Sequence, residues 1–169
     1  TVSSTGGTIN EETYFINGVK NWVDTTTKIA EDAFIDVTAD NSSARGVYVW
    51  TGDTAKGSGV EIGGNAIVTV KNAEGSIIAH GLNADAACSI TVGKSAQIDI
   101  AAASNNIKGI YSHETAGNIA ISGDALITMT GVKDAGGNVT AEANYARGIT
   151  IESGAKVTVG GNVVTNVSG

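Results

Sequence analysis

Two aspartates have a spacing that could serve catalysis. Asp36 and Asp99 occupy the same position of an eleven-residue segment that recurs along the chain, two copies apart. If successive copies stack at the spacing of β-strands, the two carboxylates lie about 10 Å apart on one outer wall. Inverting glycosidases hold their carboxyl pair roughly 6.5–9.5 Å apart. The pair is therefore slightly too wide, and a solvated face of alternating Thr and Asp is the simpler interpretation.

The remaining candidate ligands and nucleophiles are isolated. His80 and His113 have no third ligand near them in the sequence, which makes a poor zinc site. Cys88 is the single cysteine and is best explained as a small apolar filler. The sequence contains no Gly-x-Ser-x-Gly element, no phosphate-binding Gly-x-x-x-x-Gly-Lys loop and no tandem calcium-binding repeat. We therefore predict no catalytic residue, no metal site and no cofactor.

Three aromatic residues form the candidate ligand-binding site. Tyr48, Trp50 and Tyr111 follow glycines that open a strand-like segment, and we expect them on neighbouring turns of one wall. Exposed rings there could stack on sugar rings and bind a glycan. The competing interpretation is that these rings cover the glycines as ordinary packing. Longer loops at Trp50–Gly59 and Gly131–Tyr145 are further candidates for a binding surface.

The elements that position these residues follow from the recurring segment. In each copy small or apolar residues alternate with polar ones, and turn-forming residues separate two such runs, which predicts strand, corner and strand. A looser third strand, opening with Gly and an apolar residue, precedes each copy. Three short strands in roughly 30 residues predict one turn of an all-β parallel β-helix, a solenoid of about five turns. The copies are Thr27–Val37, Val60–Val70, Ile90–Ile100, Ile119–Met129 and Ile149–Val159.

Two positions of the segment should form interior ladders. The seventh is alanine in every copy, which predicts a close approach of two walls, and the ninth is a branched residue that should be buried beside it. The seventh position holds Ala33, Ala66, Ala96, Ala125 and Ala155. The ninth position holds Ile35, Val68, Ile98, Ile127 and Val157.

The two ends of the chain are expected to differ from the repeats. Residues 1–26 are more polar and should form an irregular first turn or a cap, and residues 27–169 should form the β-helix repeats. The stretch Gly160–Gly169 continues the strand pattern without a polar cap, so its backbone groups could accept another strand.

Composition narrows the range of partners. The 169 residues include 10 basic and 17 acidic side chains, and the net charge of −7 argues against a nucleic-acid partner. No stretch approaches the roughly 20 apolar residues of a membrane-spanning helix, so we expect no membrane insertion of this segment. The chain begins at Thr1 without a visible signal peptide, which suggests a mature or excised segment.

Two units of the chain resemble a known family. The units ARGITIESGAKVTVGGN and SGVEIGGNAIVTVKN are similar to repeats in the passenger domains of bacterial autotransporter adhesins, the pertactin-like right-handed β-helices. Those repeats commonly read Gly-Ile-x-Val-x-x-Gly-Ala-x-Val-x-Ile, and Gly148–Val159 fits this pattern most closely. The resemblance implies right-handed winding, a secreted passenger at the bacterial cell surface or outside the cell, and adhesion or aggregation.

Three functions remain open from the sequence. The leading hypothesis is a non-enzymatic extracellular surface adhesin or structural β-solenoid section that contacts a host or bacterial surface protein or a glycan. The second is a self-assembling subunit that stacks end to end or associates laterally. The third is a polysaccharide lyase or hydrolase that uses Asp36 and Asp99.

Overall fold

The described part of the chain is built from strands. The computed structural model describes residues 2–6, 15–22, 24–39, 42–51, 57–72, 78–102, 106–114, 116–133, 139–141 and 145–168. Within these ranges the chain forms strands β1 to β18 and no helix. Parts of the loops predicted at Trp50–Gly59 and Gly131–Tyr145 lie outside the described residues.

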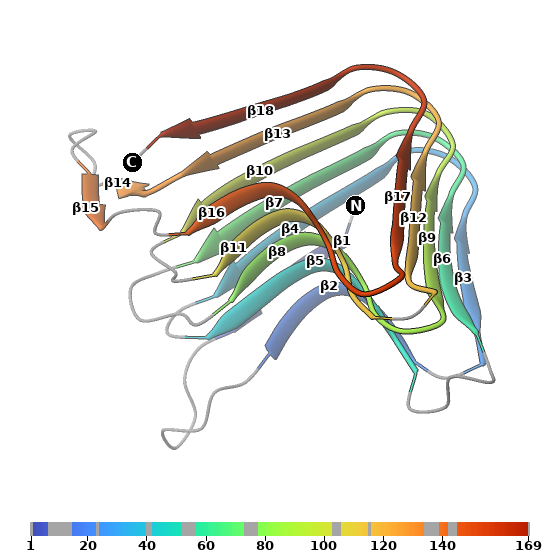
Figure 1. Cartoon of the computed structure of the whole chain (residues 1–169). Coiled ribbons are helices and arrows are strands. Elements are labelled where there is room, and N and C mark those ends of the chain that lie inside the picture. Colours follow the sequence, from blue (N-terminus) through green and yellow to red (C-terminus); the bar gives the residue numbers. More distant parts are fainter. Residues whose placement is uncertain are drawn as a thin grey trace.

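Three parallel sheets form the walls of a solenoid, and we name them by their places in Figure 1. The upper sheet contains β1 (Val2–Gly6), β4 (Ala33–Ala39), β7 (Ala66–Asn72), β10 (Ala96–Ala102), β13 (Ala125–Thr130) and β18 (Val163–Ser168). The lower sheet contains β2 (Phe15–Trp22), β5 (Ser43–Trp50), β8 (Ala79–Ala84), β11 (Ile107–Ser112) and β16 (Ala146–Ile151). The side sheet contains β3 (Thr26–Ile29), β6 (Ser58–Ile62), β9 (Cys88–Val92), β12 (Asn118–Ile121) and β17 (Lys156–Val159).

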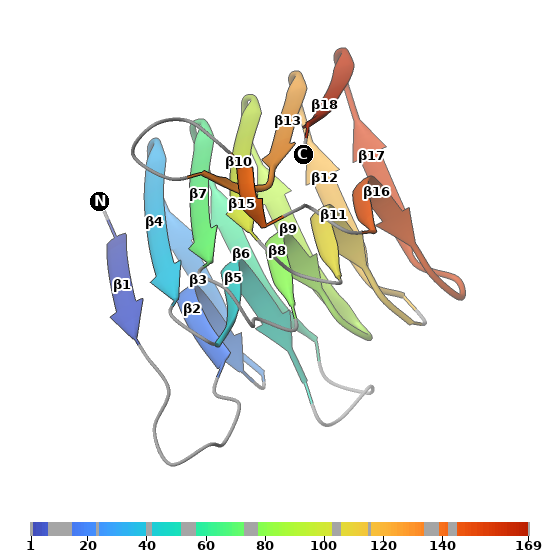
Figure 2. The ribbon, with the colours of Figure 1, turned by 90° about the vertical axis from the view of Figure 1, so that its left-hand side faces the viewer.

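Each turn, or rung, runs from a lower strand through a side strand to an upper strand. The first rung is β2, β3 and β4, and the fifth is β16, β17 and β18. In Figure 1 the chain runs counterclockwise as it advances toward the viewer, so the winding is right-handed. Figure 2 shows the rungs following one another from the β1 end to the β18 end. The predicted right-handed parallel β-helix of about five turns is confirmed.

The interior ladders have the predicted register in the first four copies. Ala96 pairs with Ala66 on one side and Ala125 on the other, and all three side chains are buried. Ile98, two residues further along β10, is completely buried between its counterparts in β7 and β13. The alternation of inward and outward residues in each strand therefore continues from rung to rung.

The fifth copy begins later than predicted. Ile149 pairs with Ile110 in the lower sheet, and Val157 pairs with Ile119 in the side sheet. The fifth copy is therefore Val157–Val167, and the predicted ladder positions of Ala155 and Val157 are wrong. In the upper sheet, residues 163 and 165 take those two positions opposite Ala125 and Ile127 of β13.

Two features explain this error. An antiparallel pair, β14 (Val132–Lys133) and β15 (Val139–Ala141), lies between β13 and β16 and lengthens the connection between the fourth and fifth rungs. In addition, the lower strand Gly148-Ile149-Thr150-Ile151 has the same alternation as the first strand of the recurring segment. Periodicity alone cannot separate two strands with the same pattern.

The glycines of the lower strands are required by close packing between the lower and upper sheets. A Cβ atom on Gly81 would collide with the side chain of Ile98, and one on Gly109 would collide with Ile127. None of these glycines has a φ in the left-handed region, so the lack of a side chain, and not a special backbone conformation, is what the fold uses.

A line of side-chain hydrogen bonds holds the corner between the side and upper sheets. The carboxylate of Asp32 accepts from the backbone N–H of Asn65 at 2.7 Å, and the amide oxygen of Asn65 accepts from the N–H of Ser95 at 3.2 Å. Ser95 Oγ accepts from the N–H of Asp124 at 3.1 Å, and Asp124 accepts from the N–H of Asn162 at 2.7 Å. The bond from the Asn65 backbone holds the pKa of Asp32 below its ordinary value. These residues satisfy corner N–H groups that the sheets do not pair.

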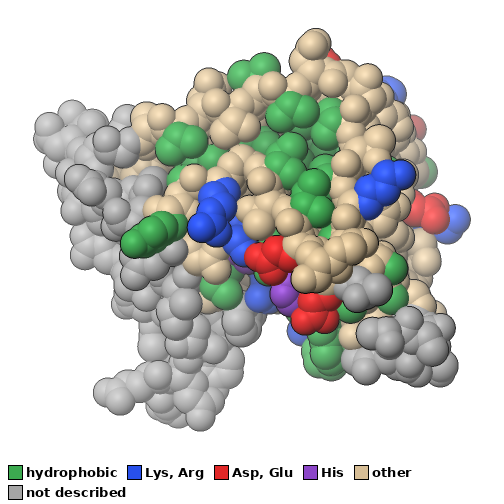
Figure 3. Space-filling model, in the orientation of Figure 1, with side chains coloured by type: hydrophobic (Ala, Val, Ile, Leu, Met, Phe, Trp, Pro, Cys, Tyr) green, Lys and Arg blue, Asp and Glu red, His purple; other side chains and the backbone are tan. Residues whose placement is uncertain are grey.

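The two ends of the described solenoid contribute regular strands. Strands β1 and β2 lie in residues 1–26, and they pair in parallel with β4 and β5. At the other end Val163, Val164 and Val167 of β18 are exposed. Figure 3 views this end and shows hydrophobic side chains gathered on it, above a group of acidic, basic and histidine side chains.

The part of the chain that the structure describes contains no helix long and apolar enough to cross a bilayer.

Candidate functional site

The outer face of the lower sheet carries three columns of outward side chains. Each lower strand contains one glycine, and the residues one before, two after and four after that glycine lie on the outer face. The first column is Asn17, Arg45, His80, Lys108 and Arg147. The second column is Lys20, Tyr48, Asn83, Tyr111 and Thr150. The third column is Trp22, Trp50, Asp85, His113 and Glu152.

Backbone hydrogen bonds keep the third column in line beyond the ends of the strands. The N–H of Asp85 donates to the carbonyl of Val49 at 3.0 Å, and the N–H of His113 donates to the carbonyl of Ala84 at 2.9 Å. The N–H of Glu152 donates to the preceding rung in the same way, at 3.0 Å. Asp85, His113 and Glu152 therefore stand side by side on consecutive rungs.

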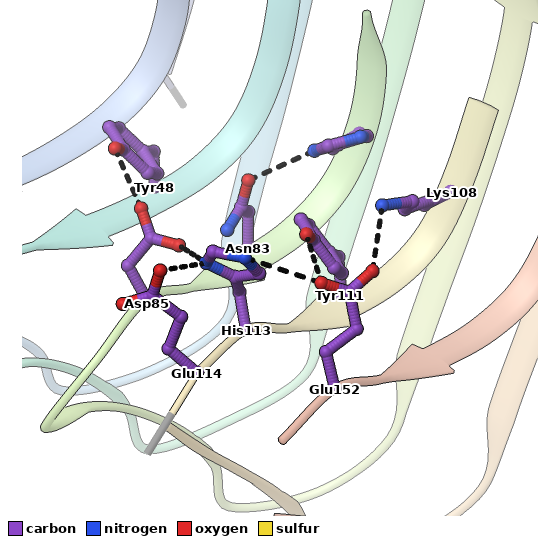
Figure 4. Close-up of polar contacts among 9 residues, drawn as sticks. Tyr48, Asn83, Asp85, Lys108, Tyr111, His113, Glu114 and Glu152 are labelled. Atoms are coloured by element: carbon purple, nitrogen blue, oxygen red, sulfur yellow. Dashed lines mark hydrogen bonds and ion pairs between the residues drawn. The ribbon is translucent and has the colours of Figure 1, made fainter. Parts of the chain in front are cut away.

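A line of polar contacts runs along the solenoid axis through these residues (Figure 4). The hydroxyl of Tyr48 donates to Asp85 Oδ2 at 2.9 Å. The other oxygen of Asp85 lies 3.1 Å from Nδ1 of His113, and Nε2 of His113 lies 3.2 Å from Glu152 Oε2. The hydroxyl of Tyr111 also donates to Glu152 Oε2, at 2.9 Å. We call Tyr48, Asp85, His113, Glu152 and Tyr111 the polar line.

His113 is the centre of the polar line because both of its ring nitrogens face carboxylates. A neutral imidazole has one N–H and can donate to only one of two acceptors, whereas an imidazolium donates to both. Glu114 adds a third carboxylate oxygen 3.7 Å from Nδ1. The ring of His113 therefore lies between Asp85 and Glu152 and within hydrogen-bonding distance of both.

The two tyrosines of the polar line are held in their protonated, donating form. Burial raises the pKa of Tyr48, and the neighbouring charge of Asp85 and the hydrogen bond to it raise this pKa further. Burial raises the pKa of Tyr111 as well, with the hydrogen bond to Glu152 as the next cause. Both hydroxyls therefore remain donors at physiological pH.

Beneath the polar line, His80 is buried as a neutral ring. Its side chain is only 2% exposed, and Nδ1 lies 2.9 Å from the amide oxygen of Asn83. Burial lowers the pKa of His80 to about 3, while the hydrogen bond to Asn83 works in the opposite direction. The edge of the ring also packs against Tyr111, with ring centroids 5.0 Å apart. We interpret His80 as a packing residue of this face.

A hollow of about 330 Å³ lies beside the polar line, on the first two rungs. Its lining residues are Lys20, Trp22, Arg45, Tyr48 and Trp50. The two indole rings pack edge to face with centroids 4.5 Å apart. Lys20 Nζ lies 4.4 Å from the centre of the Trp22 ring, and the guanidinium of Arg45 lies 4.1 Å from the centre of the Tyr48 ring. The hollow thus combines aromatic walls with two cations.

The structure brings together two of the three predicted ligand-binding residues. Tyr48 and Trp50 line the hollow. Tyr111 lies two rungs further along the second column, where Lys108 Nζ covers its ring at 3.3 Å from the centroid. Tyr111 is therefore a packing and hydrogen-bonding residue of the polar line and does not line the hollow.

Three of the described lining residues of the hollow were not predicted from the sequence. Trp22 stands four residues after Gly18, just as Trp50 stands four residues after Gly46, so aligning the chain on these glycines would have paired the two indoles. The same alignment places Lys20 beside Tyr48 and Arg45 one residue before its glycine. The eleven-residue segment covers only the side and upper strands. An alignment on that segment therefore does not compare the lower strands with one another.

The other sequence candidates lie apart from this face. Asp36 and Asp99 both pair with Thr69 in the upper sheet, so they share an outward column two rungs apart, as predicted. The side-chain amide of Gln97, on the same strand, donates a hydrogen bond to the carboxylate of Asp99 at 2.8 Å. Cys88 is buried, and burial raises the pKa of its thiol to about 11, which suits a packing role.

The carboxylates of the polar line point at His113 and not at a common point in space. Over the described ranges, no group of three or more His, Cys, Asp or Glu side chains is arranged to hold a metal ion. The interactions that the described residues of this face make are hydrogen bonds, ion pairs, cation–π contacts and ring packing.

Comparisons with known proteins add no assignment. No protein-family model, no curated protein and no solved structure matches this chain.

Proposed function

We propose that the chain is a non-enzymatic section of an extracellular β-solenoid adhesin that binds a glycan in the hollow on its lower sheet. The observation that carries the proposal is the pair of indoles, Trp22 and Trp50, beside Tyr48 in an open hollow. The apolar faces of sugar rings stack on such side chains, while their hydroxyl groups meet polar groups at the rim.

The exposure of the aromatic wall supports binding over packing. Trp22 is 53% exposed, a large apolar area that stays in contact with water in the free protein. Covering this apolar area with a ligand contributes a favourable free energy of roughly 25 cal/mol per Å². The hollow, at about 330 Å³, falls at the small end of the roughly 300–1,000 Å³ range of ligand sites, which suits one or two sugar rings.

The engagement of Asp85, which is hydrogen-bonded to the lining residue Tyr48, favours binding over hydrolysis. Asp85 already accepts from Tyr48 and contacts His113, so both of its oxygens are engaged. A glycosidase needs a second carboxyl group across the bond that it cleaves, and the described lining residues of the hollow contribute none. We therefore place Asp85 in a positioning role, as the group that fixes the Tyr48 ring.

A glycan screen followed by calorimetry tests this function. The wild-type chain should bind at least one glycan on an array, and Trp50→Ala should weaken that binding by roughly tenfold or more because stacking on one aromatic ring is worth about 1–3 kcal/mol. Phe34→Ala is the matched control, since Phe34 is 46% exposed on the upper sheet and far from the hollow. Equal losses for both variants, or cleavage of the bound glycan, would overturn the proposal.

End-to-end self-association through a second copy of the chain is a second candidate function. It is favoured by the apolar last rung of the described residues, where Ile151, Val163 and Val164 are exposed and β16, β17 and β18 are the outermost strands of their sheets. A second copy that docks its first rung there would continue the sheets. Sedimentation at increasing concentration should then show growing assemblies that Val164→Lys abolishes. A monomer at every concentration would count against this candidate.

A further inference from the structure

We propose that the ligand of the hollow is an anionic sugar, a pyranose that carries a carboxylate or a sulfate group. This inference rests on the proposed glycan-binding function and specifies the class of glycan. It is carried by the placement of Lys20 and Arg45 among the aromatic residues that line the hollow.

The described lining residues of the hollow carry a charge opposite to that of the whole chain. The chain has 17 acidic and 10 basic residues and a net charge of −7. Among the described residues, the lining of the hollow nevertheless contains two cations, Lys20 and Arg45, and no acidic residue. A positive hollow on a negative protein attracts an anionic ligand locally, while the remaining surface repels it.

The two cations are arranged around the aromatic walls and not directed away from them. Lys20 lies over Trp22, and Arg45 lies over Tyr48 on the neighbouring rung. An anionic group that enters the hollow would therefore meet an ammonium group on β2 and a guanidinium on the adjacent strand β5. Arg and Lys bind carboxylate and sulfate oxygens through charge-assisted hydrogen bonds, which are the stronger kind.

The environment of Arg45 strengthens its attraction for an anion. Burial lowers the pKa of Arg45 from its ordinary value, and the nearby Tyr48 and Asp85 oppose this effect. Asp85 also accepts a hydrogen bond from Tyr48 and contacts His113. In this partly desolvated position an additional negative group interacts more strongly than it would in bulk water.

Calorimetry with three oligosaccharides of equal length tests the inference: an oligogalacturonate, its methyl ester and a sulfated neutral oligosaccharide. We expect the acid or the sulfated chain to bind roughly tenfold or more tightly than the neutral ester. Added salt should reduce that difference. Binding of the acid alone would identify the carboxylate as the recognised group, and binding of both anions would identify the charge in general.

Two variants separate this inference from the function on which it rests. Lys20→Gln should lower affinity for the anionic ligand by a larger factor than affinity for the methyl ester, whereas Trp50→Ala should weaken both by similar factors. Equal affinity of wild-type protein for the acid, the sulfated chain and the ester would overturn the anionic specificity and leave glycan binding intact. Failure of all three ligands to bind would overturn both statements.

Discussion

The outer faces of the upper and lower sheets differ sharply although one core supports both. On the upper sheet the column that contains Asp36, Thr69 and Asp99 repeats short polar residues. On the lower sheet the third column changes from Trp to Asp to His to Glu in successive rungs, and its members contact one another. The stacked backbone fixes where each outward side chain stands but not what it is. A column whose residue types change and whose members interact is therefore the better candidate for function.

The largest effect should come from the core that both faces share. Ile98→Asp places an unpaired carboxylate in a completely buried position of β10. We expect a loss of about 4 kcal/mol or more in the free energy of unfolding, measured by chemical denaturation. Ile98→Val is the control and should cost about 1 kcal/mol. A tolerated aspartate would mean that this ladder is not interior.

The contact between the two sheets depends on glycine. In Gly109→Ala the new Cβ would meet the side chain of Ile127 and the carbonyl oxygen of Gly148. We expect a loss of about 2 kcal/mol, because neither the sheet nor the branched side chain can move away without strain. Gly57→Ala, where a Cβ finds only ordinary contact, should be almost neutral. Equal stability of the two variants would contradict the packing of the lower sheet against the upper sheet.

Acid should lower the free energy of unfolding because His80 is buried as a neutral ring. The pKa of His80 is lowered to about 3 by burial, whereas an unfolded chain has an ordinary histidine pKa of 6.5. Between these values the unfolded chain binds a proton that the folded chain does not, so stability falls as the pH is lowered from 6.5 toward 3. The expected slope is at most about 1.4 kcal/mol per pH unit.

The variant His80→Asn isolates this contribution, because carboxylates elsewhere also titrate at low pH. Its unfolding free energy, measured by denaturation at a series of pH values, should depend less steeply on pH than that of the wild type. An identical dependence for the two proteins would show that His80 is protonated in the folded state or is not buried.

A smaller loss of stability should come from the polar line. Comparing this loss with that of a variant on the upper sheet tests whether the two outer faces differ in stability. His113→Gln removes the ring that lies between Asp85 and Glu152 and should cost about 1 kcal/mol, a modest value because these side chains are partly exposed. Gln97→Ala on the upper sheet removes the exposed contact to Asp99 and should change stability by less than about 0.5 kcal/mol. If the two losses are equal in thermal or chemical denaturation, the polar line stabilises the lower face no more than a surface contact.

The interior of the fold was predictable from sequence for a simple physical reason. Alanine at the seventh position and a branched residue at the ninth recur in the first four copies, so Ala66, Ala96 and Ala125 indicated the stack. The fifth copy was misplaced because Ile149 in a lower strand has the same alternation as a first strand of the segment. Only the hydrogen-bonded register distinguishes the two.

The candidate site was predictable only in part, because it is made of neighbours that are distant in sequence. Tyr48 and Trp50 were found as aromatic residues after a glycine, whereas Trp22 lies on the preceding rung and is brought to Trp50 by the pairing of β2 with β5. The contacts of His113 with Asp85 and Glu152 likewise span three rungs. No local motif records such a contact, but an alignment of the lower-strand glycines does.

The most direct test of the account is an NMR titration of the isotope-labelled protein with an oligogalacturonate. We predict that the backbone amide shifts concentrate on β2 and β5 of the lower sheet, around Lys20, Trp22 and Trp50, and that the indole N–H signals of the two tryptophans move with them. Shifts that gather instead on the upper sheet around Asp36 and Asp99 would contradict the account.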